Sequence, residues 1–184
     1  MINKIIASLL LLFLSPLLII ISIAILINDG YPIFYKQKVL GINHKPFFLF
    51  KFRTMYINSP VIPTQEMIDA KRYIFPLGKK LRKYSLDELP QFYNVIRGDM
   101  NFIGPRPCLA NNEETVKYLR EQKNIHKIKP GITGLAQVKG RDSNNYEKKV
   151  ALDYQYLKSK NFILDCKIIF KTIFAILFPK NIKH

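Results

Sequence analysis

The amino-acid sequence is poor in the residues that build disulfide frameworks and zinc centres. It contains two cysteines, Cys108 and Cys166, and three scattered histidines. Two distant thiols without cysteine or histidine neighbours provide neither a disulfide framework nor a set of zinc ligands. We therefore expect both cysteines to be reduced, as is usual for a protein exposed to the cytosol.

Acidic residues are also scarce. The 184 residues, a length that suits one domain, include 13 Asp and Glu against 29 Lys and Arg, which gives a net charge of +16. This balance indicates a polyanionic partner, which would be nucleic acid, an anionic membrane surface or a phosphorylated substrate. The sequence has no zinc-finger, RNP or KH motif and carries a long apolar segment, so we expect no nucleic-acid partner.

A long uncharged segment lies near the N-terminus, from Ile5 to Ile27. Its 23 residues are enough to cross a bilayer as one helix. Pro16 lies at its middle and should kink the helix, and Ser15 can hydrogen-bond a carbonyl that the break frees. Each arm of about 11 residues would be roughly 16 Å long, half the hydrocarbon thickness. The residues alone leave open a kinked span and a re-entrant hairpin, with the Lys-rich C-terminal side cytoplasmic in both.

The remaining sequence predicts a mainly helical α/β fold with a small β-hairpin. Aromatic and β-branched residues favour strands at 32–39 and 47–54, joined by a turn. A helix should begin at Asp87 as its N-cap and end at Gly98. Other helices are predicted at 66–83 (interrupted at 75–78), 113–122 and 145–157, and loops rich in proline or glycine at 57–65, 99–109 and 129–141.

The C-terminal segment 162–178 is strongly apolar, and its Lys167 and Lys171 are four residues apart. A core helix is the simpler interpretation. We favour a helix lying in the membrane interface, because so small a domain cannot bury this much additional apolar surface.

Two adjacent carboxylates, Asp87 and Glu88, stand at the start of the predicted helix, between Arg82 and Arg106. A carboxylate can attack phosphorus and form an acyl phosphate, which divides one displacement into two easier steps. Arginines and a cation such as Mg²⁺ would offset the charge of the phosphates. An Asp-Glu pair at a helix start is also a common capping arrangement, and for the pair taken alone this is the favoured interpretation, which composition does not overturn.

The sequence resembles the bacterial sugar transferase family, the small monotopic phosphoglycosyl transferases, over nearly its whole length. The break at Ser15-Pro16 is similar to that family's break in its apolar helix. The other matching motifs are Lys51-Phe-Arg-Thr-Met55, Ser85-Leu-Asp-Glu-Leu-Pro-Gln91, Gly98-Asp-Met100, Ile103-Gly-Pro-Arg-Pro107 and Pro130-Gly-Ile-Thr-Gly-Leu-Ala-Gln-Val-Lys-Gly-Arg141.

The resemblance implies transfer of a sugar 1-phosphate from a UDP-sugar to undecaprenyl phosphate, with release of UMP and dependence on Mg²⁺. It implies that Asp87 is the nucleophile that becomes covalently bound to the phosphosugar. Glu88 would be its partner in metal or proton handling. Basic side chains would surround the pyrophosphate of the donor, with Arg106 at phosphate and Arg141 near the nucleotide; the expected set is Lys51, Arg53, Arg82, Arg106 and Arg141.

The resemblance also favours the re-entrant hairpin. Residues 1–30 would then be a helix-break-helix in the bacterial inner membrane. Residues 31–184 would be a catalytic domain on its cytoplasmic face with interfacial helices, touching membrane lipids and compatible with a homodimer. The chain departs from the family at Leu135, where tryptophan is usual, and at Lys38 and Lys139. A nonenzymatic basic scaffold that binds anionic lipid is the alternative, and it does not explain why Asp-Glu and the arginine loops occur together.

Overall fold

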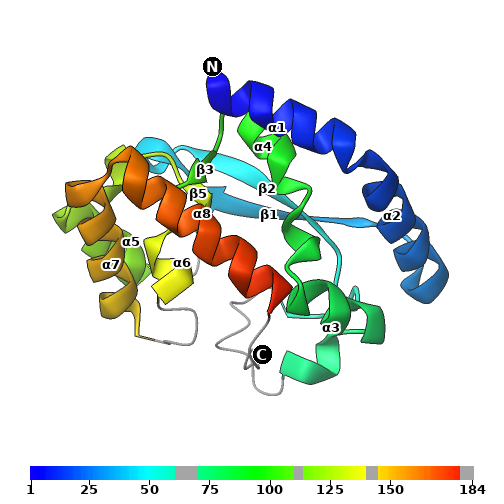
Figure 1. Cartoon of the computed structure of the whole chain (residues 1–184). Coiled ribbons are helices and arrows are strands. Elements are labelled where there is room, and N and C mark those ends of the chain that lie inside the picture. Colours follow the sequence, from blue (N-terminus) through cyan, green and yellow to red (C-terminus); the bar gives the residue numbers. More distant parts are fainter. Residues whose placement is uncertain (61–69, 110–113, 140–144, 179–184) are drawn as a thin grey trace.

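The computed structural model of the chain describes residues 1–60, 70–109, 114–139 and 145–178 (Figure 1). The described part is mainly helical and carries small sheets, as the sequence predicts. Short 3₁₀ turns connect some elements: η1 (Ile42–His44), η3 (Ala70–Tyr73), η4 (Leu86–Glu88) and η5 (Ile125–Lys127). The α-helices are α1 (Ile2–Phe13), α2 (Ser15–Asp29), α3 (Pro76–Lys83), α4 (Gln91–Arg97), α5 (Glu114–Gln122), α6 (Leu135–Lys139), α7 (Tyr146–Ser159) and α8 (Phe162–Leu177).

The predicted β-hairpin is confirmed. Strands β1 (Phe34–Leu40) and β2 (Pro46–Phe52) are antiparallel, with Phe34 opposite Phe52 and Leu40 opposite Pro46. A short strand, β4 (Cys108–Leu109), pairs with the other edge of β1, so the sheet order is β2-β1-β4. This pairing brings the segment that carries Arg106 beside the hairpin.

A second, parallel sheet joins β3 (Asn101–Ile103) to β5 (Gly131–Thr133). The loops predicted for 99–109 and 129–141 are therefore wrong for the residues that the structure describes there, which form β3, β4, β5 and α6. Gly131 does not mark a loop but permits a close contact between strands, because a Cβ on it would collide with the backbone nitrogen of Gly104. The two glycines allow the parallel strands to approach closely at this point.

The helix predicted to begin at Asp87 begins later. The chain forms η4 first, and α4 starts at Gln91 directly after Pro90, so Asp87 is not its N-cap. The prediction of the helix end is confirmed, since Gly98 adopts a left-handed φ of 91° there.

Helix α3 begins where an interruption is predicted. Pro76 occupies the first turn, where its missing N–H removes no helical hydrogen bond. Gly78 lies inside the helix, and a Cβ there would collide with the backbone carbonyl oxygen of Thr54. Part of the helix predicted for 66–83, and of the loop predicted for 57–65, falls outside the described residues. The helices predicted at 113–122 and 145–157 are confirmed as α5 and α7.

The N-terminal helices are bent by 60° at the predicted break. Ser15 Oγ donates a hydrogen bond of 2.7 Å to the carbonyl oxygen of Leu12, as expected for a carbonyl released by Pro16. Helix α1 packs on α4, and α2 buries Ile21 and Ile25 in a cluster with side chains of β2 and α3. In the described residues no single helix is long and apolar enough to cross a membrane; the bent pair together meets that criterion by length and composition. The re-entrant geometry stays a prediction.

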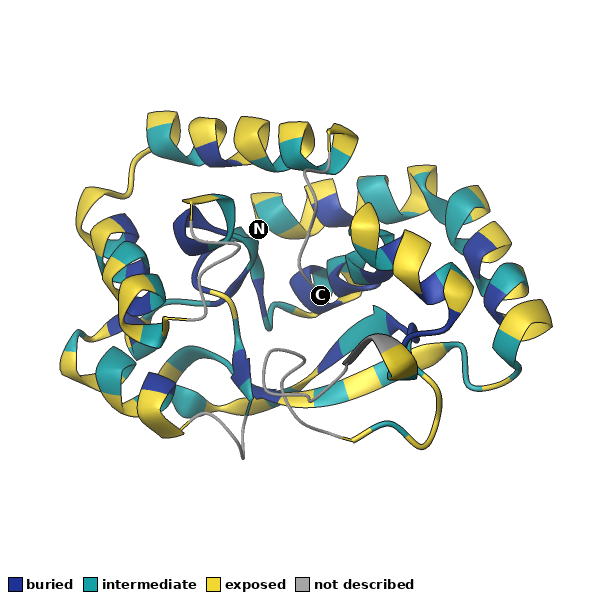
Figure 2. Ribbon diagram, turned by 90° about the horizontal axis from the view of Figure 1, so that it is seen from below, coloured by how far each residue is buried: buried dark blue, intermediate teal, exposed yellow. Residues whose placement is uncertain are grey.

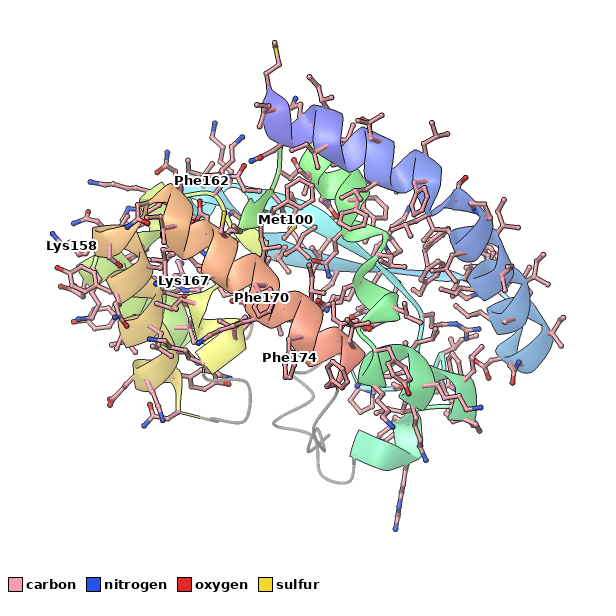
Figure 3. All side chains as sticks on the ribbon, viewed as in Figure 1. Met100, Lys158, Phe162, Lys167, Phe170 and Phe174 are labelled. Carbon is pink, nitrogen blue, oxygen red and sulfur yellow. The ribbon has the colours of Figure 1, made fainter. Side chains whose placement is uncertain are left out.

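Helices α1, α2 and α8 carry exposed apolar side chains, among them Leu12, Ile20 and Phe170. Figure 2 shows that exposed residues recur along the helices of the fold. Helix α8 buries Ile168 in a cluster with Leu135 of α6 and Tyr156 of α7 but leaves Phe162, Phe170 and Phe174 exposed, with Lys167 beside them (Figure 3). The helix is therefore not a core helix. A membrane-interfacial position agrees with this apolar and basic surface and stays a prediction.

Asn94 hydrogen-bonds the backbone of β2 at the edge of the sheet. Its side chain is fully buried, donates 2.7 Å to the carbonyl of Phe48 and accepts 3.1 Å from the amide of Phe50. Since β2 is an edge strand, these bonds satisfy backbone groups that have no neighbouring strand. Asn94 therefore fixes α4 to the strand that ends in the motif Lys51-Phe-Arg-Thr54.

We expect Asn94→Ala to lower the free energy of unfolding by about 2–4 kcal/mol, because a buried carbonyl and a buried amide of β2 lose their partners. Denaturant unfolding of the detergent-solubilised protein measures this. The exposed Asn28, which bonds Ala24 within its own helix, is the matched control, and Asn28→Ala should cost less than about 0.5 kcal/mol. Equal stability of the two variants would contradict the role of Asn94.

Candidate active site

Asp87 and Glu88 lie in the η4 turn between α3 and α4. Ser85 enters the turn with a left-handed φ of 53°, and the amide of Glu88 donates 3.2 Å to its carbonyl. Leu86 and Leu89 anchor the turn in the apolar cluster that α2, β2 and α3 share. The carboxylates are therefore held on a short, well-anchored segment.

Glu88 is bound by two cations. Its Oε1 lies 3.4 Å from Lys51 Nζ, on β2, and 3.2 and 3.3 Å from the two terminal nitrogens of Arg106. Burial alone would raise the pKa of Glu88. The charges of Arg106 and Lys51 and their hydrogen bonds outweigh burial and lower its pKa to about 2. Glu88 is therefore ionised throughout the physiological range.

Asp87 differs from its neighbour. It is only 9% exposed, and no other described residue gives its carboxyl group a hydrogen bond or an ion pair. Burial, followed by the charge of Glu88, raises the pKa of Asp87, while Lys51, Arg82 and Arg106 act in the opposite direction. The carboxyl oxygens of Asp87 thus lie among cations without being engaged by them, as a nucleophile requires.

Lys51, Arg82 and Arg106 come from separate elements and converge on the two carboxylates. Arg82, near the end of α3, donates from Nε to Thr54 Oγ1 at 2.9 Å. Burial lowers the pKa of both Lys51 and Arg82, with repulsion from Arg106 adding to it and the carboxylates opposing it. Three cations against two carboxylates leave one positive charge in excess, which suits an anionic ligand.

Arg53 does not join this group. Its guanidinium is 5% exposed, pairs with the Asp29 carboxylate at 2.7 Å and donates 2.8 and 2.6 Å to the carbonyls of Asp29 and Gly30. Arg53 therefore binds the end of α2, and these contacts do not support its predicted role at the substrate. Arg141 lies outside the described residues, so its predicted role stays a prediction.

The carboxylates also fit a magnesium ion. No group of three or more His, Cys, Asp or Glu that could hold a metal occurs in the described part of the chain. Mg²⁺ does not require such a group, because it is commonly bound by one or two carboxylates together with substrate phosphates and water. Asp87 and Glu88 have the right donor chemistry, and the uncommitted Asp87 oxygens are available.

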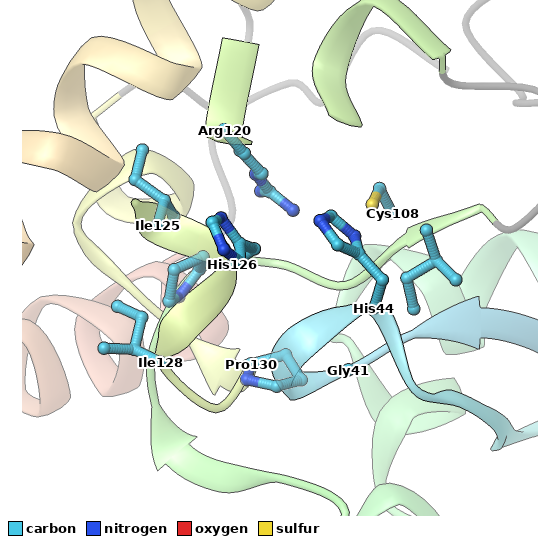
Figure 4. A pocket seen from close by; sticks show the side chains of 10 residues that line it. Gly41, His44, Cys108, Arg120, Ile125, His126, Ile128 and Pro130 are labelled. Carbon is cyan, nitrogen blue, oxygen red and sulfur yellow. The ribbon is translucent and has the colours of Figure 1, made fainter. Parts of the chain in front are cut away.

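A small pocket elsewhere unites two of the scattered histidines (Figure 4). The rings of His44 and His126 stack with centroids 5.0 Å apart, and His44 Nε2 lies 2.9 Å from Glu121 Oε1. Burial lowers the pKa of His44, while Glu121 opposes the shift. Their distance along the sequence hides this pair, and its lining residues contribute nothing to the Asp87 site.

Sequence reasoning also missed Thr54 as a partner of Arg82. The residue lies inside the motif Lys51-Phe-Arg-Thr-Met55, which draws attention to its charged members. Its hydroxyl carries no charge, and only the three-dimensional contact at 2.9 Å distinguishes it from an ordinary strand threonine.

The chain is similar to known sugar transferases. A family model described as bacterial sugar transferase matches residues 1–179. The chain is 38% identical to the uncharacterized sugar transferase EpsL of Bacillus subtilis, over 97% of this chain and 87% of the relative. It is 36% identical to the exopolysaccharide production protein ExoY of Sinorhizobium fredii, over 97% and 85% of the two chains.

A further relative is the UDP-glucose:undecaprenyl-phosphate glucose-1-phosphate transferase of Escherichia coli, 36% identical over 92% of this chain. This chain spans only 38% of that enzyme's length. The family match covers the helical break, the paired carboxylates and the three converging cations. The chain therefore belongs to the bacterial sugar transferase family.

Proposed function

We propose that the chain transfers a sugar 1-phosphate from a UDP-sugar to undecaprenyl phosphate, with release of UMP, at the cytoplasmic face of the bacterial inner membrane. The names of relatives from Escherichia coli and Komagataeibacter xylinus, both undecaprenyl-phosphate glucose phosphate transferases, support this donor and acceptor. The name of ExoY supports a role in polysaccharide production. The bent apolar pair α1–α2 is suited to hold the chain at the lipid that carries the acceptor.

One observation carries the proposal. Asp87 is buried and has no hydrogen-bond or ion-pair partner among the residues that the structure describes, while the adjacent Glu88 is ionised and bound by Lys51 and Arg106. Two neighbouring carboxyl groups with different environments can take different roles in one reaction. Asp87 is the group free to attack, and Glu88 holds the cations that would receive the phosphates.

In the first step, an Asp87 carboxylate oxygen attacks the sugar-bearing phosphorus of the donor. The new bond joins that oxygen to phosphorus, and the bond from phosphorus to the bridging oxygen breaks, so UMP leaves with the bridging oxygen. Lys51, Arg82 and Arg106 offset the charge that gathers on the phosphoryl oxygens. The product is an acyl phosphate between Asp87 and the sugar 1-phosphate.

In the second step, an oxygen of undecaprenyl phosphate attacks the same phosphorus. The bond from phosphorus to Asp87 breaks, and the carboxylate returns to its starting state. The product is a lipid-linked diphosphate sugar. Because each step breaks one phosphorus–oxygen bond and forms another, neither step needs an oxidant or a reductant.

Mg²⁺ is part of the proposal. Asp87 and Glu88 would hold it together with donor phosphates, where it would neutralise charge on the phosphate oxygens. The protein's own residues bind the donor and orient it toward Asp87, and Lys51, Arg82 and Arg106 favour the ionised form of Asp87 against the effect of burial.

We expect Asp87→Asn to lower UMP release at least about 10³-fold, because the amide cannot form the acyl phosphate. The assay uses undecaprenyl phosphate and a panel that includes UDP-glucose and UDP-galactose. Mass spectrometry after incubation with donor alone should find the added phosphosugar on Asp87 of the wild-type chain. Glu114→Gln, at an exposed surface carboxylate, is the control and should retain full activity.

Normal turnover by Asp87→Asn would contradict the covalent mechanism. If the wild-type chain releases no UMP from any UDP-sugar but binds anionic vesicles in a salt-dependent manner, the lipid-binding scaffold is correct instead.

Glu88→Gln should slow formation of the covalent adduct about 10²-fold without abolishing it, because Lys51 and Arg106 lose the charge that holds them. Time-resolved mass spectrometry of Asp87 separates this slow adduct from the absence of adduct in Asp87→Asn. Adduct formation at the wild-type rate would exclude Glu88 from the reaction.

The rate of adduct formation should have a bell-shaped dependence on pH. Asp87 must be ionised, and because its pKa is raised above the ordinary 3.8, activity should be lost on the acid side at a higher pH than for an exposed aspartate. Lys51 must be protonated, and because its pKa is lowered from 10.5, activity should also fall on the alkaline side below that value. Lys51→Arg should move the alkaline limb to higher pH, since a guanidinium stays protonated. An unchanged alkaline limb in this variant would exclude Lys51 as its source.

A further inference from the structure

Thr54 connects the end of the hairpin to the catalytic turn. It lies two residues after the end of β2, is buried, and its hydroxyl accepts a hydrogen bond of 2.9 Å from Arg82 Nε. Within the described part of the chain, Thr54 is the residue that hydrogen-bonds the Arg82 guanidinium. A bond to Nε fixes the plane of the guanidinium and leaves both terminal nitrogens for other partners.

The backbone of Thr54 is held against the same helix. Gly78 lies one turn before Arg82 on α3, so both residues are on the face that meets Thr54. A Cβ on Gly78 would collide with the carbonyl oxygen of Thr54. The missing side chain lets α3 approach closely enough for the hydroxyl of Thr54 to reach Arg82.

Arg82 adjoins the turn that carries Asp87, because α3 packs against η4 and the amide of Ser85 donates 3.1 Å to the carbonyl of Arg82. Among the charges that affect Arg82, Asp87 exerts the largest attraction, ahead of Glu88. Arg82 in turn is one of three cations that oppose the rise in the pKa of Asp87. Lys51 and Arg106 differ from Arg82, because both are bound to Glu88.

We propose that Thr54 is a positioning residue, whose hydroxyl orients Arg82 so that its terminal nitrogens face Asp87 and the phosphate that Asp87 attacks. Thr54 touches neither substrate nor the reacting atoms and acts through Arg82. Gly78 provides the close contact that this arrangement needs. The inference rests on the proposed phosphosugar transfer. It adds an uncharged residue to the charged residues proposed for that reaction.

The test compares Thr54→Val, which keeps the shape but removes the hydroxyl, with Thr54→Ser, which keeps the hydroxyl. Thr54→Val should lower kcat for adduct formation about 10- to 100-fold with little change in KM, and Thr54→Ser should restore most of it. Thr133→Val is the matched control, because Thr133 also shares a hydroxyl hydrogen bond, with Thr172, away from the catalytic turn. Thr133→Val should keep full activity.

A double-mutant cycle separates positioning from general stability. In an Arg82→Lys background, which lacks the Nε donor at that place, Thr54→Val should cause no further loss. A second measurement needs no turnover: in ¹⁵N NMR the Nε–H of Arg82, assigned with Arg82→Lys, should exchange with solvent faster in Thr54→Val than in the wild type, because it has lost its acceptor. If Thr54→Val does not fold, Thr54→Ala replaces it.

Three results would overturn the proposal. They are full activity of Thr54→Val, equal loss in Thr54→Ser and Thr54→Val, and the same loss from Thr54→Val in the Arg82→Lys background as in the wild type. Absence of UMP release from the wild-type chain would instead refute the proposed function. In that case an unchanged exchange rate of the Arg82 Nε–H in Thr54→Val would refute the positioning role as well.

Discussion

The structure around the η4 turn depends on the burial of two adjacent carboxylates among cations. Glu88 is bound by Lys51 and Arg106, whereas no described residue pairs with the Asp87 carboxylate. Removing one member of a buried charge group leaves the others uncompensated at a cost of about 3–5 kcal/mol. Because of this cost, the two carboxylates need the cations that come from β2, α3 and the segment before β4. The hairpin, the parallel sheet and the helices position these cations around the short η4 turn.

The frame is built from contacts between elements that are distant in the sequence. β4 follows the segment of Arg106 and pairs with β1, while Asn94 fastens α4 to the open edge of β2. Gly104 and Gly131 let β3 and β5 meet without side chains between them. Apolar clusters surround these strand pairings and the Asn94 hydrogen bonds. The geometry of the site therefore depends on packing as much as on its charges.

Much of this arrangement was predictable from sequence, and the failures have physical causes. Residue patterns predicted the hairpin, α5 and α7, and the chemistry of proline predicted the break at Pro16. These features depend on residues that are close in the sequence. The loops predicted around Gly104 and Gly131 were wrong, because the same glycines that mark turns also permit close strand contacts. The structure brings together Asp87, Glu88, Lys51, Arg82 and Arg106, which the motifs had grouped, and their roles stay predictions. The motifs did not predict the contacts of Arg53 or Thr54, which depend on tertiary neighbours.

The pairing of Arg53 with the end of α2 matters for any attempt to shorten the protein. A truncation that removes residues 1–30 would delete the Asp29 carboxylate and the carbonyls of Asp29 and Gly30, which hydrogen-bond or pair with this guanidinium, and would leave it the Phe75 ring. It would also uncover the apolar surface that Ile21 and Ile25 now cover. A version of the protein without residues 1–30 would therefore need a compensating substitution at Arg53 and new polar residues around it.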